Sequence, residues 1–189
     1  LARQPESPLR LMVFRKLYPY IFKDSRAGAM QQSFFAANLD KLGDPLSSHM
    51  IRWHNTGRTR GFLSEEVRAA FDFGGFLERI RQSLPPAFDS WDSLSKAQYI
   101  EMVTFMSNYL LSSQGDRVAM GHSVEIRLPF LDFRLIEFMS RVPPELKIFG
   151  LKEKYILKKT FSEPVPAEIL KRDKHPYRAP ISQSLFHPR

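Results

Sequence analysis

The sequence predicts an all-α domain, and three observations support that prediction. Apolar residues recur every three or four positions over long stretches, which is typical of amphipathic helices. No stretch of about four to eight residues alternates apolar and polar side chains between turn signals, so no sheet is expected. The chain has 189 residues, of which 43% are hydrophobic, and this is enough for a buried core. We therefore expect a single helical domain over residues 1–189.

The composition excludes several kinds of protein. The chain contains no cysteine, which rules out a disulfide scaffold and cysteine-based metal sites or nucleophiles, and suits a reducing cytoplasm. No apolar run approaches the roughly 20 residues of a membrane span, and the first residues are too polar for a secretory signal, so no membrane partner is expected. The net charge of +8 is compatible with nucleic acid or with an anionic ligand such as ATP.

The first third of the chain is predicted to be partly helical. Residues 5–23 and 28–39 carry apolar side chains at helical spacing. Residues 43–63 are predicted to be irregular, because glycine and proline punctuate them. Within that range His49 and His54 lie close together, but no third ligand follows at a suitable spacing. We therefore predict no metal site there.

Two short helices and one long helix are predicted in the middle of the chain. Residues 64–71 begin with a serine cap, and residues 74–84 end before two prolines. The longest helical pattern covers residues 94–114 and is expected to begin at a Ser93 or Ser95 cap. Its apolar residues are predicted to form one buried stripe: Tyr99, Val103, Met106 and Leu110.

The last third is also predicted to be helical. Asp132 can cap a helix that ends before the proline pair at 143–144. Residues 146–150 are expected to form a turn or a short extended piece, and residues 152–161 a helix with lysines on its exposed face. One more helical turn is predicted after Pro166.

The chain is organised around the stretch Gln114–Phe133, which reads QGDRVAMGHSVEIRLPFLDF. It contains two acid–base pairs, Asp116 with Arg117 and Glu125 with Arg127, separated by mostly small and apolar residues. Charges in an apolar segment are costly to bury unless they are paired. The stretch is therefore either a structural ion-pair network or the wall of a polar cavity.

Three motifs, in the right order, resemble those of a known family. The run GDRVAMGHSVEIRLPFLD is similar to GDRMSMAHSVEVRVPFLD, a signature of the synthetase domain of glutamine-dependent asparagine synthetases. GLKEKYILKKTF resembles the next landmark, GLKxKxLLR, and PAEILKRDKHPYRAPI resembles the one after it, PxEIxxRPKxGF. The sequence departs from the family at Asp173 and at Pro176-Tyr177, where proline and Gly-Phe are usual, although a subset of members carries QPYRAP.

The resemblance implies part of an ATP-dependent amidotransferase. In the family, a separate glutaminase domain releases ammonia, and the synthetase domain adenylates the side-chain carboxylate of aspartate, which ammonia then converts to asparagine. The family binds ATP with an SGGxDS loop and a metal ion with a GEGxDE-type segment, and neither motif occurs in this chain. We therefore expect the helical carboxy-terminal part of an α/β synthetase domain, with ATP and Mg²⁺ bound mainly by residues upstream.

The resemblance also implies candidate site residues. Lys174 matches the cation that the family places at the reacting acyl-adenylate, and Asp116 is a second candidate catalytic residue. Four further residues are candidates for lining the substrate pocket or shaping the ammonia path: Arg117, Glu125, Arg127 and Arg178. Structural alternatives stay open, namely an ion pair or helix cap at the end of the long helix, a buried turn after it, and an ordinary basic loop around the lysine.

Three functions stay open from the sequence alone. The first is an asparagine synthetase-like ligase with aspartate, ATP and ammonia as substrates, whose partners are the upstream nucleotide-binding part and the glutaminase domain. The second is a synthetase of the same fold that amidates another carboxylate or closes a ring. The third, a nucleic-acid-binding helical module, is disfavoured because the positive charges do not gather on one helix face. The oligomeric state, a homodimer included, is left open.

Overall fold

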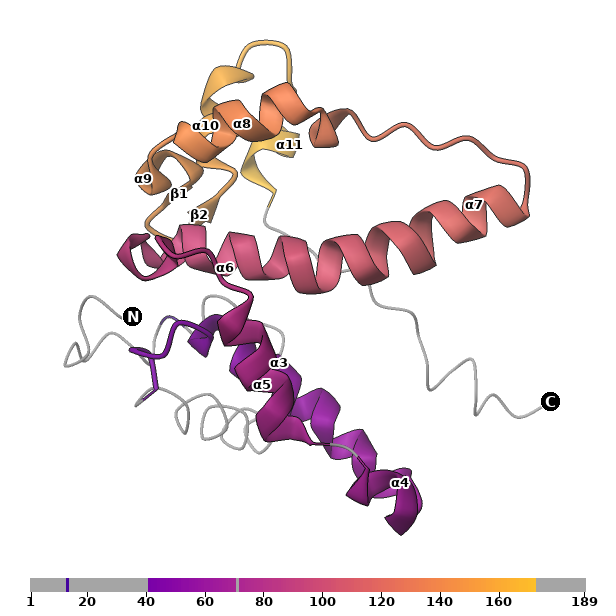
Figure 1. Ribbon diagram of the computed structural model, residues 1–189. Coiled ribbons are helices and arrows are strands. Elements are labelled where there is room, and N and C mark those ends of the chain that lie inside the picture. The colour runs from indigo at the N-terminus through magenta and orange to yellow at the C-terminus, as the bar shows by residue number, and fades with distance from the viewer. Residues whose placement is uncertain (1–12, 14–40, 71, 173–189) are drawn as a thin grey trace, which may run out of the picture. The chain divides into compact units, whose positions relative to one another are not determined.

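The computed structural model describes residues 13, 41–70 and 72–172, and this part of the chain is mostly helical, as predicted (Figure 1). The helices predicted at residues 5–23 and 28–39 fall outside it, apart from Val13, which is helical. None of the described helices is long and apolar enough to cross a lipid bilayer. The chain divides into two compact units between Glu145 and Leu146, a division that the sequence pattern did not indicate.

The first unit consists of helices joined by short turns. In chain order they are α3 Ser47–Gly57, the 3₁₀ helix η2 Arg58–Phe62, α4 Glu65–Ala69, α5 Phe73–Gln82, the 3₁₀ helix η3 Phe88–Ser90, α6 Ser93–Glu101, the π-helix η4 Met102–Asp116, α7 Arg117–Gly121, the 3₁₀ helix η5 Pro129–Leu131 and α8 Phe133–Arg141. The short helix α9, Pro144–Lys147, crosses into the second unit.

Four buried side chains form the core of the first unit. Leu46 precedes α3, Met50 lies on α3, Phe88 opens η3 and Ile100 lies near the end of α6. Leu46 and Ile100 have no exposed surface, and Phe88 is 1% exposed. The half-buried ring of Trp91 lies against Phe88, with 5.3 Å between the ring centroids. These contacts hold α3, η3 and α6 together.

The prediction that residues 43–63 are irregular was wrong, because they contain α3 and η2. Leu46, Met50 and Trp53 follow each other at spacings of four and three residues, so one face of α3 lies on the core. Asp44 fixes the start of this helix by accepting a hydrogen bond from the Leu46 amide at 2.7 Å. No glycine interrupts the interior of this helix, since Gly57 is its last residue.

The predicted helices that follow are present, with one change of cap. The Ser64 hydroxyl accepts a hydrogen bond from the amide of Val67, as expected for a helix cap. The long helix begins at Asp92 instead of a serine: the carboxylate accepts from the amides of Leu94 at 2.9 Å and Ser95 at 3.1 Å. A carboxylate also suits the positive end of the helix dipole, so it replaces the predicted serine cap.

A cluster of polar side chains joins α6 to α3, and we call it the Glu101 clasp. His49, 5% exposed, lies with Nε2 2.8 Å from the Glu101 carboxylate and Nδ1 2.8 Å from the Ser48 hydroxyl. Arg52 donates to both oxygens of the same carboxylate and lies 4.5 Å above the Phe105 ring. Because a carboxylate only accepts, Nε2 carries the proton, and Nδ1 accepts from the serine. A neutral imidazole therefore satisfies the whole cluster.

We predict that mild acid destabilises the first unit through this clasp. Burial, with a smaller contribution from the Arg52 charge, lowers the pKa of His49 from its ordinary 6.5, although the Glu101 carboxylate acts in the opposite direction. The unfolded chain then binds a proton that the folded chain does not, so stability falls as the pH drops below about 6.5. The Arg52 hydrogen bond lowers the pKa of Glu101 from 4.5, and its stabilising effect is lost at still lower pH. Urea denaturation at pH 7.5, 6.0 and 5.0 measures the effect.

The matched variant for this experiment is His49→Gln, which can still donate to Glu101 but cannot take up a proton. Its stability should change less than that of the parent chain between pH 7.5 and pH 5.0. An identical pH dependence in both proteins would contradict the assignment of the acid effect to His49.

The second unit corrects the prediction that the chain contains no sheet. Its strands β1 Ile148–Phe149 and β2 Lys152–Glu153 pair antiparallel around Gly150, which has a φ of +61° and opens a two-residue turn. The helices α10 Tyr155–Thr160 and α11 Ala167–Lys171 follow. The helix predicted over residues 152–161 therefore begins three residues late, because its first residues pair with β1.

Candidate functional site

One continuous helix leads to the candidate site, running from α6 through η4 to the end of α7 (Figure 1). The sequence predicted an α-helix here, but the 15 residues of η4 are π-helical. The predicted buried stripe is also absent, since Val103 is 40% exposed and Leu110 is 38% exposed. A π-helix has more residues per turn than an α-helix, so side chains at α-helical spacing do not share one face.

A tight turn at the end of α7 reverses the chain. The buried Ala119 supplies its acceptor: its carbonyl receives the amides of His122 at 3.0 Å and Val124 at 2.8 Å. To close this turn Ser123 adopts a φ of +56°, which is unusual for a residue other than glycine. Strained residues of this kind often occur at functional sites. The strain lies inside the stretch Gln114–Phe133 that the sequence singled out.

We predict that Ser123→Gly raises the free energy of unfolding by roughly 0.5–1 kcal/mol. The left-handed conformation costs a side-chain-bearing residue about 1–2 kcal/mol, and glycine loses only about 0.5–1 kcal/mol of that gain through its greater freedom in the unfolded chain. Urea denaturation at neutral pH measures the change.

Ser113→Gly is the control, because Ser113 is exposed within η4 and has no positive φ. Glycine there should lower stability by about 0.5–1 kcal/mol. If both glycine variants lose stability equally, Ser123 does not carry the strain.

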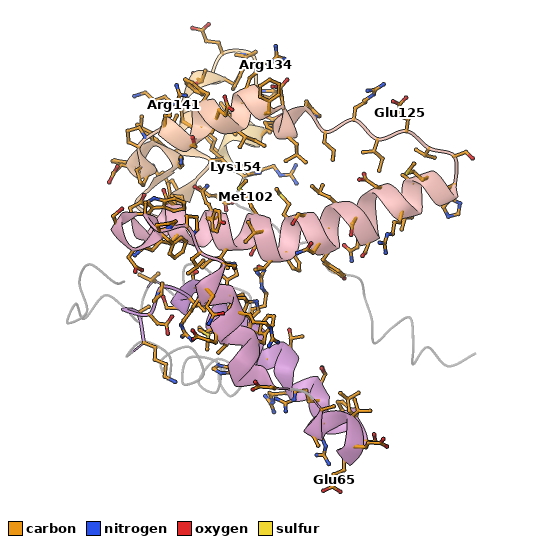
Figure 2. The ribbon with its side chains drawn as sticks, in the orientation of Figure 1. Glu65, Met102, Glu125, Arg134, Arg141 and Lys154 are labelled. Atoms are coloured by element: carbon orange, nitrogen blue, oxygen red, sulfur yellow. The ribbon has the colours of Figure 1, made fainter. Side chains whose placement is uncertain are left out.

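The pair formed by Glu125 and Arg127 is confirmed, but it is not a buried turn. Arg127 Nη2 forms an ion pair with Glu125 Oε1, and the two side chains are 83% and 72% exposed, respectively. Both lie on the irregular segment 124–128, and Figure 2 shows Glu125 pointing away from the helix α7. An exposed pair of this kind adds little stability. The charges are therefore available for a partner or a substrate.

Asp116 and Arg117 lie at the junction of η4 and α7, and both are exposed. Consecutive helical residues point in different directions, and within the described residues the two form no ion pair with each other. Asp116 occupies the cap position of α7 but its carboxylate does not bond to an α7 amide. The structural alternatives weighed for these two residues therefore find no support in the described part. Their site roles stay predictions.

Asp132 is a helix cap, as predicted. Its Oδ1 accepts the amide of Arg134 at 2.9 Å, and the Arg134 guanidinium donates to both carboxylate oxygens. The Arg134 side chain is the main reason why the pKa of Asp132 lies below its ordinary value, and Asp132 in turn raises the pKa of Arg134. The carboxylate is thus committed to starting α8.

Lys174 and Arg178 lie outside the described residues, so their assigned roles stay predictions. Sequence reasoning missed two features that the structure adds to this region, the strained Ser123 and the Glu101 clasp. Neither feature could be recognised in the sequence. A positive φ is expected from the sequence mainly at glycine, and His49 and Glu101 are 52 residues apart.

Several large apolar side chains are exposed in the segment that follows η4. Met120 is 77% exposed, Phe130 70%, Phe133 68% and Phe138 60%. Where exposed apolar side chains form a continuous surface, it usually marks a place where another part of a protein packs.

The chain belongs to the asparagine synthase family, which matches residues 13–189. It is 40% identical over 96 residues to "Asparagine synthetase [glutamine-hydrolyzing] 3" of Bacillus subtilis, covering 49% of this chain and 15% of that protein. It is also 35% identical over 112 residues to "Amidase chry2" of Gibberella zeae and 37% identical over 112 residues to "Amidase chyE" of Penicillium rubens, each match covering 56% of this chain and 16% of the relative. The chain thus spans about a sixth of the length of these relatives. No solved structure gives a significant match.

Proposed function

We propose that this chain is the helical carboxy-terminal part of the synthetase domain of an ATP-dependent, glutamine-hydrolysing ligase that converts aspartate to asparagine. The observation that carries the proposal is the stretch Gln114–Phe133. There a family signature coincides with the end of a long helix, the strained turn at Ser123 and the exposed Glu125–Arg127 pair. The family match and the names of the relatives support it.

The proposed reaction avoids an impossible leaving group. Ammonia cannot displace oxide from a free carboxylate, so a carboxylate oxygen of aspartate first attacks the α-phosphorus of ATP, and pyrophosphate leaves. Ammonia then attacks the acyl carbon, and AMP leaves with one of the original carboxylate oxygens. A cation beside the phosphorus stabilises the charge that develops there, and Lys174 is the proposed cation. Asp116, Arg117, Glu125, Arg127 and Arg178 are the proposed residues around it.

We infer that ATP and Mg²⁺ are bound mainly by another part of the enzyme. The sequence contains neither the SGGxDS loop nor the GEGxDE-type segment. Within the described residues, no group of three or more His, Asp or Glu side chains could hold a metal ion. The exposed apolar side chains of α7, η5 and α8, namely Met120, Phe130, Phe133 and Phe138, are candidate contacts for that nucleotide-binding part. A glutaminase domain is the proposed source of ammonia.

The decisive experiment labels both oxygens of the aspartate side-chain carboxylate with ¹⁸O. The intact enzyme is incubated with labelled aspartate, ATP, Mg²⁺ and glutamine, and the nucleotide product is analysed by mass spectrometry. We expect AMP that carries one ¹⁸O atom, asparagine that keeps the other ¹⁸O atom in its side-chain amide, and unlabelled pyrophosphate. Formation of ADP, or of AMP without the label, would rule out adenylation of aspartate.

The alternative function is amidation of a carboxylate other than that of aspartate, and two observations favour testing it. Two of the relatives are named amidases rather than asparagine synthetases. The sequence also departs from the family pattern at Asp173 and at Pro176-Tyr177. Pyrophosphate release is measured with aspartate and with a panel of other carboxylic acids, amino acids included. An enzyme with the alternative function would release pyrophosphate with one of the other acids and not with aspartate.

A further inference from the structure

Three side chains of the Glu101 clasp form a chain of hydrogen bonds that ends at an exposed hydroxyl. The Ser48 hydroxyl lies 2.8 Å from His49 Nδ1, and His49 Nε2 lies 2.8 Å from the Glu101 carboxylate. Because the carboxylate holds the proton on Nε2, the lone pair of Nδ1 faces the hydroxyl. A hydroxyl beside a base that a third group orients is the arrangement of an activated nucleophile. The two ring nitrogens exchange the positions that they have in serine proteases, but each makes the contact that its task requires.

The His49 ring is neutral and fixed in place, as a general base must be. It is 5% exposed, and burial is the largest of the causes that hold its pKa below 6.5, so Nδ1 carries no proton at pH 7. Among the described residues two charged side chains act on this ring, Glu101 from α6 and Arg52 from α3. Arg52 donates to both oxygens of the Glu101 carboxylate and keeps it ionised. The carboxylate can therefore stabilise the imidazolium that forms when Nδ1 takes up the hydroxyl proton.

Ser48 lies in the first turn of α3, where its own backbone amide has no acceptor in the described part of the chain. The amides on either side, those of Ser47 and His49, donate to backbone carbonyls. The first amides of a helix find no acceptor within the helix, and the helix dipole adds a positive potential there. A negative charge that develops on a group bonded to Ser48 Oγ would thus lie near an available N–H donor, which is how enzymes stabilise oxyanions.

We propose that Ser48, His49 and Glu101 form a nucleophilic site that hydrolyses small activated esters. Ser48 Oγ attacks the carbonyl carbon of the ester while its proton moves to His49 Nδ1. The bond to the alcohol oxygen then breaks, the alcohol leaves with that proton, and an acyl-serine remains. Water attacks the acyl carbon and gives a proton to Nδ1, which returns it to Ser48 Oγ as the carboxylic acid leaves. The net reaction converts an ester and water to an acid and an alcohol.

The position of the nucleophile decides the class of substrate. Ser48 is exposed at the start of α3, so a small acyl donor reaches its hydroxyl directly from solvent. At such a place the remote parts of a substrate supply little binding energy, and the donor must react through its own good leaving group. The proposal is independent of the ligase activity, because it uses none of the residues assigned to that reaction.

A fluorophosphonate tests whether Ser48 is a nucleophile in the 189-residue chain. The hydroxyl oxygen bonds to phosphorus, fluoride leaves, the proton moves to His49, and mass spectrometry of peptides locates the label. We expect Ser48 to react about a hundredfold faster or more than Ser113, an exposed serine of η4, because a positioned base accelerates such a step by that order. His49→Gln keeps a donor for Glu101 but contains no base, so labelling of Ser48 should fall to the rate of Ser113. Equal labelling of the two serines in the parent chain, or unchanged labelling in His49→Gln, would overturn the proposal.

Hydrolysis of p-nitrophenyl acetate tests the complete reaction. Ser48→Ala should abolish multiple turnover, whereas Ser47→Ala, which removes the neighbouring hydroxyl of the same helical turn, should retain it. The rate should rise with pH and reach a plateau near pH 7, since the reaction needs unprotonated His49, whose pKa lies below 6.5. The proposal fails if Ser48→Ala is as active as the parent chain, or if the rate above pH 7 is simply proportional to the hydroxide concentration.

Discussion

Lys174→Met should reduce pyrophosphate release by the intact enzyme about a hundredfold or more at saturating ATP and aspartate. Methionine keeps much of the length of the side chain and removes its charge. The phosphorus gains negative charge during adenylation that neither substrate presents at that point, so a cation there stabilises the transition state more than the bound substrates. The loss should therefore appear in kcat, with little change in the KM for ATP. Hydrolysis of glutamine should persist.

Two further variants define what the lysine does. Lys174→Arg should restore little activity, because a planar guanidinium does not replace a compact ammonium charge. Lys171→Met removes a neighbouring positive charge at the exposed end of α11 and should leave pyrophosphate release unchanged. If the two methionine variants lose activity equally, the total positive charge of this part of the sequence matters and Lys174 has no specific role.

Most of the helical elements within the described residues could be predicted from local signals. Ser64 and Asp132 are caps in the structure because their side chains satisfy free amides at a helix start, which a sequence reveals directly. The prediction for residues 43–63 was wrong because glycine and proline were taken to interrupt helices. The spacing of Leu46, Met50 and Trp53 instead places one face of α3 on the core. The short hairpin around Gly150 was not predicted, because strands of two residues are too short to show an alternation of apolar and polar side chains.

Less of the candidate site could be predicted, because its features depend on backbone geometry and distant contacts. The Glu125–Arg127 pair was predictable, since an acid and a base two positions apart are close in the sequence itself. The conformation of Ser123 was not, because it follows from the two amides that bond to the Ala119 carbonyl. The π winding of η4 was also not readable, since its apolar spacing is that of an α-helix and only side-chain contacts such as the hydrogen bond from Asn108 to the Val103 carbonyl favour a π-helix.

Phe88→Ala should lower the free energy of unfolding of the 189-residue chain by about 3–5 kcal/mol, the largest stability change we expect. Phe88 is 1% exposed and packs against the rings of Trp91 and Tyr99, at centroid distances of 5.3 Å and 5.8 Å. Alanine removes the aromatic contacts and leaves a cavity where η3 meets α6. Small domains are stabilised by only about 5–15 kcal/mol in total, so much of the population could unfold at moderate temperature. Urea denaturation followed by tryptophan fluorescence measures the change, since Trp91 reports on this core.

The control is Phe130→Ala, which makes the same chemical change at a side chain that is 70% exposed. Its effect on stability should stay within about 0.5 kcal/mol, because a surface side chain loses little packing. The comparison separates burial from the general effect of losing a phenyl ring. If Phe88→Ala lowered the free energy of unfolding as little as Phe130→Ala, the four-residue core could not be what holds α3, η3 and α6 together. The Glu101 clasp alone would then have to fix α6, the start of the helix that leads to Asp116.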